Sequence, residues 1–365
     1  MGVAYIGEGI SMADVSNRKP IVTLAQVEEL KPEKDRVLHS ATHDEILMGA
    51  TTDIYFIKTH EILTQKGFAD KVVTAEVFAR GEGILAGMDE TVAMLSAGIS
   101  ASGLELWALP EGSAFSDREV LLRIKGRYTD FGLYETALLG CLASACGWAS
   151  AAAQVKAAAG DAPVTCFGAR HVHPAVAPVM ERAALIGGVD GASCVLGAKL
   201  AGKNPVGTVP HAVFLIMGDS VDVARAYHEI MPPGEVRTVL VDTFKDECEE
   251  ALRVAQALGD NLQYIRLDTP GERGGVTPGL VREVKFRLEK AGFGHVKVLV
   301  SGGLTLEKIA ELKAAGADAF GVGSFISAAK PIDMTMDIKE IEGVPVAKRG
   351  RLPGITPNDR LIKRA

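Results

Sequence analysis

The feature of this sequence that most constrains its fold is an alternation, from about Tyr134 onward, of short apolar runs with helical segments. The runs that predict strands are residues 164–167, 191–195, 213–217, 236–241, 264–267, 296–300 and 319–322. Helical segments at 175–186, 221–230, 246–258, 279–291 and 306–315 separate most of them. Such alternation implies a parallel sheet with helical crossovers, and this many units favour a closed or nearly closed barrel.

The chain before this alternation predicts a separate α/β domain. Residues 72–78, 104–109 and 119–124 resemble short strands, and residues 89–98 a helix. After Pro331 the chain becomes irregular and basic. We therefore expect a tail at 1–17, an N-terminal domain at 18–135, a barrel at 136–332, and an irregular C-terminal segment at 333–365 that returns to the N-terminal domain.

Composition narrows the classes of function. The formal net charge is −7 and the sequence has no long Lys/Arg block, which argues against a nucleic-acid partner. No apolar run reaches the roughly 20 residues that cross a bilayer, and residues 1–16 lack a signal-peptide core, so we expect a cytoplasmic protein without a membrane partner. The 5 cysteines form no CxxC pair and are interpreted as buried thiols rather than as a zinc site.

Two aspartates follow successive predicted strands. Asp242 comes after the run 239–241, and Asp268 comes after 265–267. Because the carboxyl ends of parallel strands meet at one edge of a sheet, we expect the two carboxylates to face the same small volume. Such a pair can bind Mg²⁺, hold sugar hydroxyls or stabilise an oxocarbenium-like centre. Either aspartate alone could instead be a helix cap, but the repetition on successive strands argues against this.

Two glycine-bearing segments follow the last two predicted strands. One is Ser301-Gly302-Gly303, and the other contains Gly321, Gly323 and Ser324 about 20 residues later in the chain. Glycine lets backbone N–H groups approach an anion, and in barrels the loops after the last strands are the usual phosphate site. The ordered pair predicts a ligand that carries phosphate.

A cationic cluster, with a histidine further on, marks the stretch 164–211. Arg170 and two histidines, His171 and His173, follow the first strand of the predicted barrel, and His211 is expected where a later strand starts. Arginine suits a carboxylate or a phosphate through paired hydrogen bonds. The nearby Pro174 and the arginine itself argue against a metal site at the two histidines, whereas a structural and a functional role for His211 are equally open.

Taken together and in order, these motifs resemble the nicotinate phosphoribosyltransferase family, in the form found in archaea and some bacteria. The segments that carry the resemblance are TTDIY, FGARHVHP, IGGVDGAS, PVGTVPHA, LVDTF, RLDTP, VSGGL, FGVGS and AKRG. The resemblance implies an irregular (β/α) barrel joined to an N-terminal α/β domain with a hammerhead-like β portion. It also implies a homodimer or higher homo-oligomer with shared active sites.

The reaction that the resemblance implies joins nicotinate to phosphoribosyl pyrophosphate (PRPP) with Mg²⁺, giving nicotinate mononucleotide and pyrophosphate for NAD synthesis. Many members couple it to ATP hydrolysis through a phosphorylated histidine, which falls on His211. Asp242 and Asp268 would orient the ribose hydroxyls or the metal. The remaining substrate residues would be Tyr55, Arg170, His173 and Thr208, and the phosphate residues Ser301, Gly302, Gly303, Gly321, Gly323 and Ser324.

Three other functions remain possible from the sequence. Quinolinate phosphoribosyltransferase, which decarboxylates its substrate, resembles this chain around the strand before Arg170 and the Ser301-Gly302-Gly303 loop. However, Ala169-Arg170-His171 replaces its usual Thr-Arg-Lys run, and Leu299 stands where an acidic residue is expected. A non-catalytic phosphate-binding barrel would be expected to lose Asp242 and Asp268. A phosphosugar aldolase or epimerase would want a strand-end lysine, and none stands out.

Overall fold

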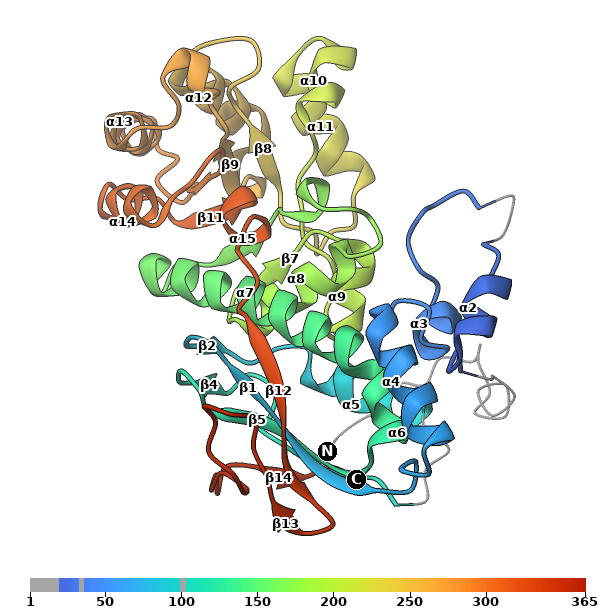
Figure 1. The fold of residues 1–365 in the computed structure, drawn as a ribbon. Coiled ribbons are helices and arrows are strands. Elements are labelled where there is room, and N and C mark those ends of the chain that lie inside the picture. The colour runs from blue at the N-terminus through green and yellow to red at the C-terminus, as the bar shows by residue number, and fades with distance from the viewer. Residues whose placement is uncertain (1–19, 33–35, 99–102) are drawn as a thin grey trace. The chain divides into compact units, whose positions relative to one another are not determined.

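The computed structural model describes residues 20–32, 36–98 and 103–365, and these form two units (Figure 1). The first unit comprises residues up to Gly147 together with Pro331–Ala365, and the second is Trp148–Lys330. The division falls inside helix α7 (Glu135–Ala159), whereas the boundary expected from sequence at 135/136 coincides with the start of that helix. The expected tail at 1–17 lies outside the described residues.

The first unit is built on an antiparallel sheet with the strand order β13-β12-β1-β5-β3-β14. The strands are β1 (Val72–Ala79), β3 (Glu105–Ala108), β5 (Val120–Arg127), β12 (Met334–Ile341), β13 (Val344–Pro345) and β14 (Ile362–Lys363), and β2 (Gly83–Ile84) pairs with β4 (Ala114–Phe115) beside it. The strands predicted at 72–78, 104–109 and 119–124 are confirmed. Their alternating apolar side chains supply much of this unit's core.

A buried ion pair fastens the C-terminal segment to this sheet. Glu76 in β1 accepts a hydrogen bond of 2.9 Å from Arg123 Nε in β5 and one of 3.1 Å from the backbone N–H of Thr356. Arg123 in turn donates to the carbonyl of Thr356 at 2.6 Å. Because the buried carboxylate finds both a cation and a backbone donor, the segment is held by satisfied polar groups as well as by β12 and β14.

Helices flank the sheet of the first unit. They are α2 (Leu24–Glu29), α3 (His43–Leu47), α4 (Ile54–Gln65), α5 (Met88–Gly98), α6 (Tyr128–Phe131) and the first half of α7. Thr23 and Thr42 start α2 and α3 with capping boxes, in which each threonine exchanges hydrogen bonds with the residue three positions later. The helix predicted at 89–98 is confirmed by α5.

In the described part of the chain, one helical stretch, Tyr128–Ala159, has the length and apolar composition of a membrane span. Its residues Leu138, Leu142 and Cys146 are buried in the core of the first unit, and Val155 and Ala159 in that of the second. A core helix of a soluble protein meets the same criteria, so length and composition do not identify a membrane segment here.

The second unit contains a parallel six-stranded sheet with the order β7-β6-β11-β10-β9-β8. Its strands are β6 (Val164–Cys166), β7 (Gly191–Ala192), β8 (Thr238–Leu240), β9 (Tyr264–Leu267), β10 (Lys297–Val300) and β11 (Ala319–Val322). The sheet is curled, and β7 and β8 are its two edges (Figure 1). This confirms the predicted fold class, a separate α/β domain joined to an irregular barrel with fewer than eight strands.

The crossover helices of the second unit match most of the predicted segments. They are α8 (Ala177–Ile186), α9 (Val195–Leu200), α11 (Ser220–Ile230), α12 (Glu247–Leu258), α13 (Pro278–Lys290), α14 (Leu306–Ala314) and the short α15 (Ser324–Ser327). Figure 1 shows α12, α13 and α14 along the outer side of the strands. Their buried positions, such as Val254, Val284 and Ile309, complete the core of this unit.

The strand predicted at 213–217 is wrong, because these residues belong to helix α10 (His211–Met217). Pro210 supplies the N-cap, and Gly218 ends the helix in the left-handed conformation with φ 87°. Phe214 is buried, but Ile216 is 84% exposed, so the run has the one-sided burial of a short surface helix. His211 therefore opens a helix rather than a strand, and the sheet has no seventh strand between its edges β7 and β8.

Gly187 tests the packing of α8 against α7. A Cβ at this position would lie 2.1 Å from the backbone oxygen of Ala149, which cannot move aside without shifting α7. We expect Gly187→Ala to lower the free energy of unfolding by at least about 2 kcal/mol, since overpacking a rigid core forces backbone shifts. Denaturant titration measures this change.

Gly140 provides the matched control for the same substitution. It lies within α7 with no heavy atom within 4 Å of an added Cβ. Gly140→Ala should raise the free energy of unfolding by up to about 1 kcal/mol, because alanine is the better helix former. Equal effects of the two substitutions would contradict the packing at Gly187.

Candidate active site

The carboxyl ends of the parallel strands surround a cavity of about 340 Å³ in the second unit. Four strands contribute most of its lining through the loops that follow β6, β9, β10 and β11, as parallel α/β folds place their sites. The lining residues are Phe167, Ala169, Arg170, His171, Ser193, Gly207, Thr208, Arg266, Asp268, Ser301, Gly302, Gly303, Gly321, Gly323 and Ser324. Nine of the site residues predicted from sequence lie in this lining: Arg170, Thr208, Asp268, Ser301, Gly302, Gly303, Gly321, Gly323 and Ser324.

Glycines form the wall of the cavity at β10 and β11. Gly302 and Gly303 have φ of 91° and 57°, a conformation that side-chain-bearing residues rarely adopt. A Cβ on Gly321 would lie 2.3 Å from the ring of Phe167, and a Cβ on Gly323 would lie 2.9 Å from the ring of His171. The absence of side chains therefore leaves backbone surface exposed to a ligand and lets two rings pack against β11.

Arg266 in β9 is the central side chain of the site, and sequence reasoning missed it. Its Nε donates to Ser301 Oγ at 2.8 Å, Nη1 to Thr208 Oγ1 at 2.8 Å, and Nη2 to Asp268 Oδ2 at 3.1 Å. The guanidinium carbon also lies 5.1 Å from the ring centre of Phe167. The available signal was a charged residue inside an apolar strand, two positions before Asp268 and so on the same face.

A second cluster of polar side chains, next to the contacts of Arg266, brings both predicted aspartates close to His211. Nε2 of His211 lies 3.8 Å from Asp242 Oδ2 and 3.7 Å from Asp268 Oδ2, while its Nδ1 lies 3.1 Å from Thr243 Oγ1. Asp268 also accepts a hydrogen bond of 2.8 Å from Ser301 Oγ. Thus the loops after β8, β9 and β10 and the start of α10 bring their polar groups together, as the strand-end argument predicts for the two aspartates.

Asp242 is a buried carboxylate whose oxygens make no hydrogen bond within the described residues. Its side chain is only 1% exposed. Burial raises the pKa of Asp242 to about 6, an effect that the positive charge of His211 opposes and that the negative charge of Asp268 increases. A buried carboxylate without a partner is costly, which indicates a site built to receive a positive group or a donor.

The donor set suits Mg²⁺ better than a structural metal. Among the described residues, no group of three or more His, Cys, Asp or Glu side chains is arranged to hold a metal ion. Mg²⁺ commonly takes only one or two protein carboxylates and completes its shell with water and substrate phosphate. Asp242, with its unpartnered oxygens, and Asp268 fit that pattern.

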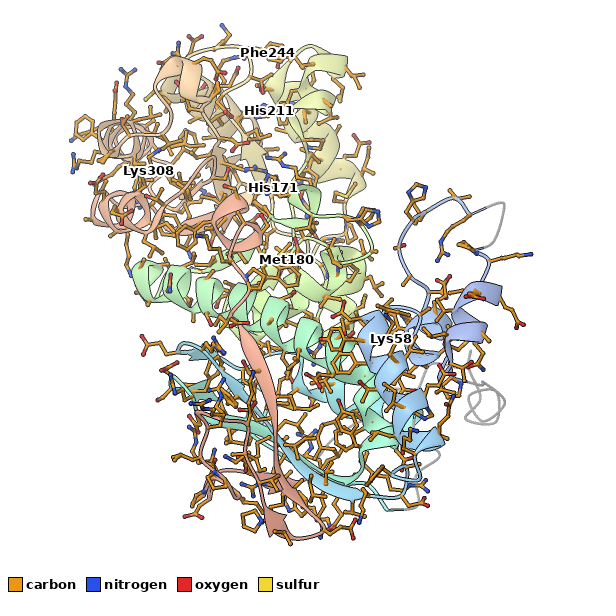
Figure 2. The ribbon with its side chains drawn as sticks, in the orientation of Figure 1. Lys58, His171, Met180, His211, Phe244 and Lys308 are labelled. Atoms are coloured by element: carbon orange, nitrogen blue, oxygen red, sulfur yellow. The ribbon has the colours of Figure 1, made fainter. Side chains whose placement is uncertain are left out.

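Two other predicted substrate residues lie outside the lining of this cavity. His173 follows the β6 loop, and its Nδ1 accepts a hydrogen bond of 3.1 Å from the backbone N–H of Ala175, which is the arrangement of a turn residue. Tyr55 belongs to the first unit, in the first turn of α4, where it is 54% exposed and packs on Phe56 with ring centres 4.2 Å apart. Figure 2 labels His171 and His211 among the side chains of the second unit.

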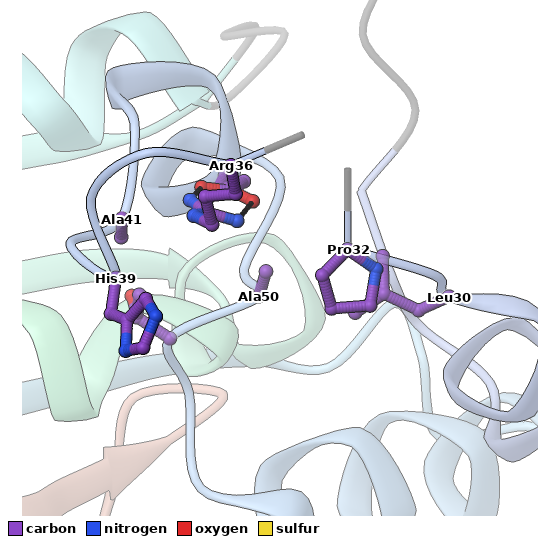
Figure 3. A pocket seen from close by; sticks show the side chains of 8 residues that line it. Leu30, Pro32, Arg36, His39, Ala41 and Ala50 are labelled. Carbon is purple, nitrogen blue, oxygen red and sulfur yellow. Dashed lines mark hydrogen bonds and ion pairs between the residues drawn. The ribbon is translucent and has the colours of Figure 1, made fainter. Parts of the chain in front are cut away.

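The first unit has a larger hollow of about 540 Å³, whose one arginine is already paired with groups of the chain (Figure 3). Its lining includes Arg36, His39 and Glu45. Arg36 Nη1 donates to Glu45 at 2.6 Å, and its other nitrogens donate to the carbonyls of Leu38 and Ser40. Since the guanidinium of Arg36 is already paired within the chain, this hollow offers an anion fewer available hydrogen-bond donors than the strand-end cavity does.

Comparison with known proteins agrees with this geometry. Residues 53–146 match the model for the N-terminal domain of quinolinate phosphoribosyl transferase, and residues 148–337 match that for its C-terminal domain. Nicotinate phosphoribosyltransferase pncB1 of Mycobacterium tuberculosis is 30% identical over 341 residues, an alignment that covers 82% of this chain and 74% of the relative. The sequence comparison thus spans both units.

Solved structures show the same fold. The nicotinate-nucleotide pyrophosphorylase of Pyrococcus furiosus superposes with a TM-score of 0.83 at 45% identity, over 88% of this chain and 82% of that one. Human nicotinic acid phosphoribosyltransferase superposes with a TM-score of 0.68 at 20% identity, over 84% and 77% of the two chains. The second of these likenesses concerns the fold alone.

The raised pKa of Asp242 predicts a pH-dependent stability. Because its folded-state pKa of about 6 exceeds the ordinary value of 3.8, ionisation is easier in the unfolded chain, and stability falls as the pH rises from about 4 to about 6. Asp242→Asn removes this charge. We expect its melting temperature to exceed that of the wild type by roughly 2–6 °C at pH 7 and by progressively less toward pH 4.

Calorimetry of both proteins from pH 4 to pH 8 measures this difference. Subtracting the two melting temperatures cancels other titrating groups, among them Glu135, whose pKa burial raises to about 7. An Asn variant that is less stable at pH 7, or a difference that does not change with pH, would show that Asp242 is not a strained buried carboxylate.

Proposed function

Since the chain belongs to the quinolinate phosphoribosyl transferase family, we propose that it transfers the phosphoribosyl group of PRPP to nicotinate, yielding nicotinate mononucleotide and pyrophosphate. The observation that carries the proposal is the content of the one strand-end cavity. It combines a glycine wall suited to phosphate, the carboxylate of Asp268, and arginines suited to a carboxylated ring. The carboxylate of Asp242 lies outside this lining, on the other side of the contact that His211 makes with both aspartates.

The glycine wall would hold the 5′-phosphate. Backbone at Gly302, Gly303 and Gly323 borders the cavity without side chains, so its N–H groups can approach phosphate oxygens. Ser301 is not free for this task, because its hydroxyl already links Arg266 to Asp268. We therefore assign Ser301 to holding these two side chains and the glycines to the ligand.

The arginines favour a base with a single carboxylate. The guanidinium of Arg266 already donates hydrogen bonds to Thr208, Asp268 and Ser301. Arg170 lines the same cavity and, among the described residues, has no hydrogen-bond or ion-pair partner. One uncommitted guanidinium suits the one carboxylate of nicotinate, bound through two parallel hydrogen bonds. The ring of Phe167, fixed between Arg266 and Gly321, lines the cavity and would contact the base.

In the proposed mechanism the pyridine nitrogen attacks the anomeric carbon as pyrophosphate leaves. Positive charge then develops on the ribose ring, and the carboxylates of Asp242 and Asp268, which lie close together around His211, would stabilise it and orient the hydroxyls. Mg²⁺ held by these aspartates would neutralise charge on the leaving pyrophosphate. Arg170 and Phe167 would hold the base in line, and such positioning supplies much of the rate.

ATP coupling through His211 is a further part of the proposal. The imidazole is 37% exposed, so it can be reached by a phosphate donor. Thr243 at Nδ1 and the two carboxylates near Nε2 fix its orientation. Phosphorylation would require an unprotonated ring nitrogen to attack the transferred phosphoryl group as ADP leaves.

Quinolinate is the second candidate substrate. The matching domain models carry its name, and the name of the Pyrococcus furiosus protein specifies the nucleotide and pyrophosphate but not the base that supplies the ring. Quinolinate has a second carboxylate, which would need another cation beside Arg170. A non-catalytic phosphate-binding barrel is less well supported, because both aspartates are brought into one site.

A steady-state assay with PRPP and Mg²⁺ distinguishes these functions when nicotinate, nicotinamide and quinolinate are offered separately. We expect nicotinate to give nicotinate mononucleotide with kcat/KM at least about 100-fold above that for nicotinamide, which lacks the charge that Arg170 would pair with. Product chromatography and CO₂ release measure the outcomes. Release of CO₂ from quinolinate, with no product from nicotinate, would reverse the assignment.

His211→Ala tests the coupling to ATP. In the wild type we expect ATP to increase turnover of nicotinate, and in the variant we expect the ratio of rates with and without ATP to fall to about one, because the phosphate acceptor is gone. The ratio separates this role from a general loss of activity. Persistence of the wild-type ratio in the variant would remove His211 from the coupling.

A further inference from the structure

Glu181 in α8 is a buried carboxylate that the proposed reaction does not use directly. Its side chain is 0% exposed, and both of its oxygens are occupied. Oε1 accepts hydrogen bonds from the backbone N–H of Ala169 at 3.1 Å and from Ser193 Oγ at 3.0 Å, and Oε2 accepts one from the backbone N–H of Cys194 at 2.6 Å. None of these donors is a cation, so neutral dipoles alone compensate the buried charge.

The donors belong to two loops at the rim of the cavity. Ala169 starts the 3₁₀ turn Ala169–His171 in the loop between β6 and α8, which we call the Arg170 loop. Ser193 and Cys194 form the link between β7 and α9, which we call the Ser193 loop. Arg170 and Ser193 both line the cavity. One carboxylate therefore joins the two loops that end the neighbouring strands β6 and β7.

The Arg170 loop has a second anchor on its other side. His171 Nδ1 lies 3.2 Å from Ser327 Oγ in α15, and its ring packs against Gly323. Figure 2 labels His171 and Met180, the residue that precedes Glu181 on α8. Arg170 thus stands between a residue fixed by Glu181 and a residue fixed by Ser327, while its own guanidinium makes no hydrogen bond among the described residues.

We propose that Glu181 is a positioning residue that fixes the Arg170 loop against the Ser193 loop and so shapes the end of the cavity that takes the pyridine carboxylate. The inference rests on the proposed function, in which Arg170 pairs with that carboxylate. The glycine wall that would hold the phosphate is at the ends of β10 and β11, and no N–H group of this wall donates to Glu181. Loss of Glu181 should therefore affect the base far more than PRPP.

The test compares Glu181→Gln with the wild type in full kinetics with nicotinate and PRPP. Glutamine keeps the shape but replaces one acceptor oxygen by an NH₂ group, so a buried N–H or hydroxyl loses its acceptor. We expect KM for nicotinate to rise about tenfold or more, because the Arg170 loop loses one of its two anchors, with KM for PRPP within about twofold. Ser193→Ala removes one donor only and should give a smaller change of the same kind.

Glu250→Gln is the matched control. Glu250 is equally buried, lies on α12, and bonds Arg253 outside the cavity. We expect it to lower the melting temperature without changing the ratio of the two KM values. If Glu181→Gln behaves like this control, or raises both KM values alike, Glu181 is only structural and the inference is wrong.

Calorimetric titration of nicotinate into the wild type separates this inference from the proposed function. A wild type that neither turns over nor binds nicotinate overturns the proposed function, and the inference falls with it. An active wild type whose Glu181→Gln variant has unchanged nicotinate affinity overturns the inference alone.

Discussion

The side chain of Arg266 is only 16% exposed, and its guanidinium donates hydrogen bonds to three separate segments of the chain. Its hydrogen bonds reach Thr208 before α10, Asp268 at the end of β9 and Ser301 at the end of β10. Because the guanidinium is planar and always charged, the directions of these bonds are fixed together rather than separately. The spacing between the start of the glycine wall at Ser301, the carboxylate of Asp268 and the ring of Phe167 depends on this one residue.

The site therefore concentrates buried charges that do not all compensate one another. Arg266 and Asp268 are paired, and Glu181 is satisfied by neutral donors, but among the described residues Asp242 has no hydrogen-bond partner and only the imidazole of His211 lies near it, at 3.8 Å. Replacing buried charges by apolar residues is often neutral or stabilising for a fold, so stability alone does not explain such a cluster. A substrate that develops positive charge, together with its metal ion, would relieve the repulsion between the two aspartates, so the strain is located where the chemistry is proposed.

Much of this arrangement was predictable from sequence because it depends on strand ends. Apolar runs followed at once by Asp242, Asp268 or Gly302 identify the edge of a parallel sheet at which side chains converge. Arg266 was harder to recognise, because a charged residue within a strand shows its function only once the facing loops are known. Residues 213–217 were misassigned because a short apolar run has no clear period, and exposure, which sequence does not display, distinguishes the surface helix from a strand.

That misassignment bears on how the site works. A strand at 213–217 would have extended the sheet beyond one of its edges, β7 or β8, and His211 would have been a strand residue with its neighbours alternating between two faces. Instead the chain turns at Pro210 into α10, so the segment from Gly207 to His211 runs free of the sheet. This lets Thr208 accept from Arg266 while His211 reaches the carboxylates of Asp242 and Asp268. The open edge of the sheet thus bears on the site, since residues 213–217 belong to a helix whose first residue, His211, faces both carboxylates instead of pairing with a strand.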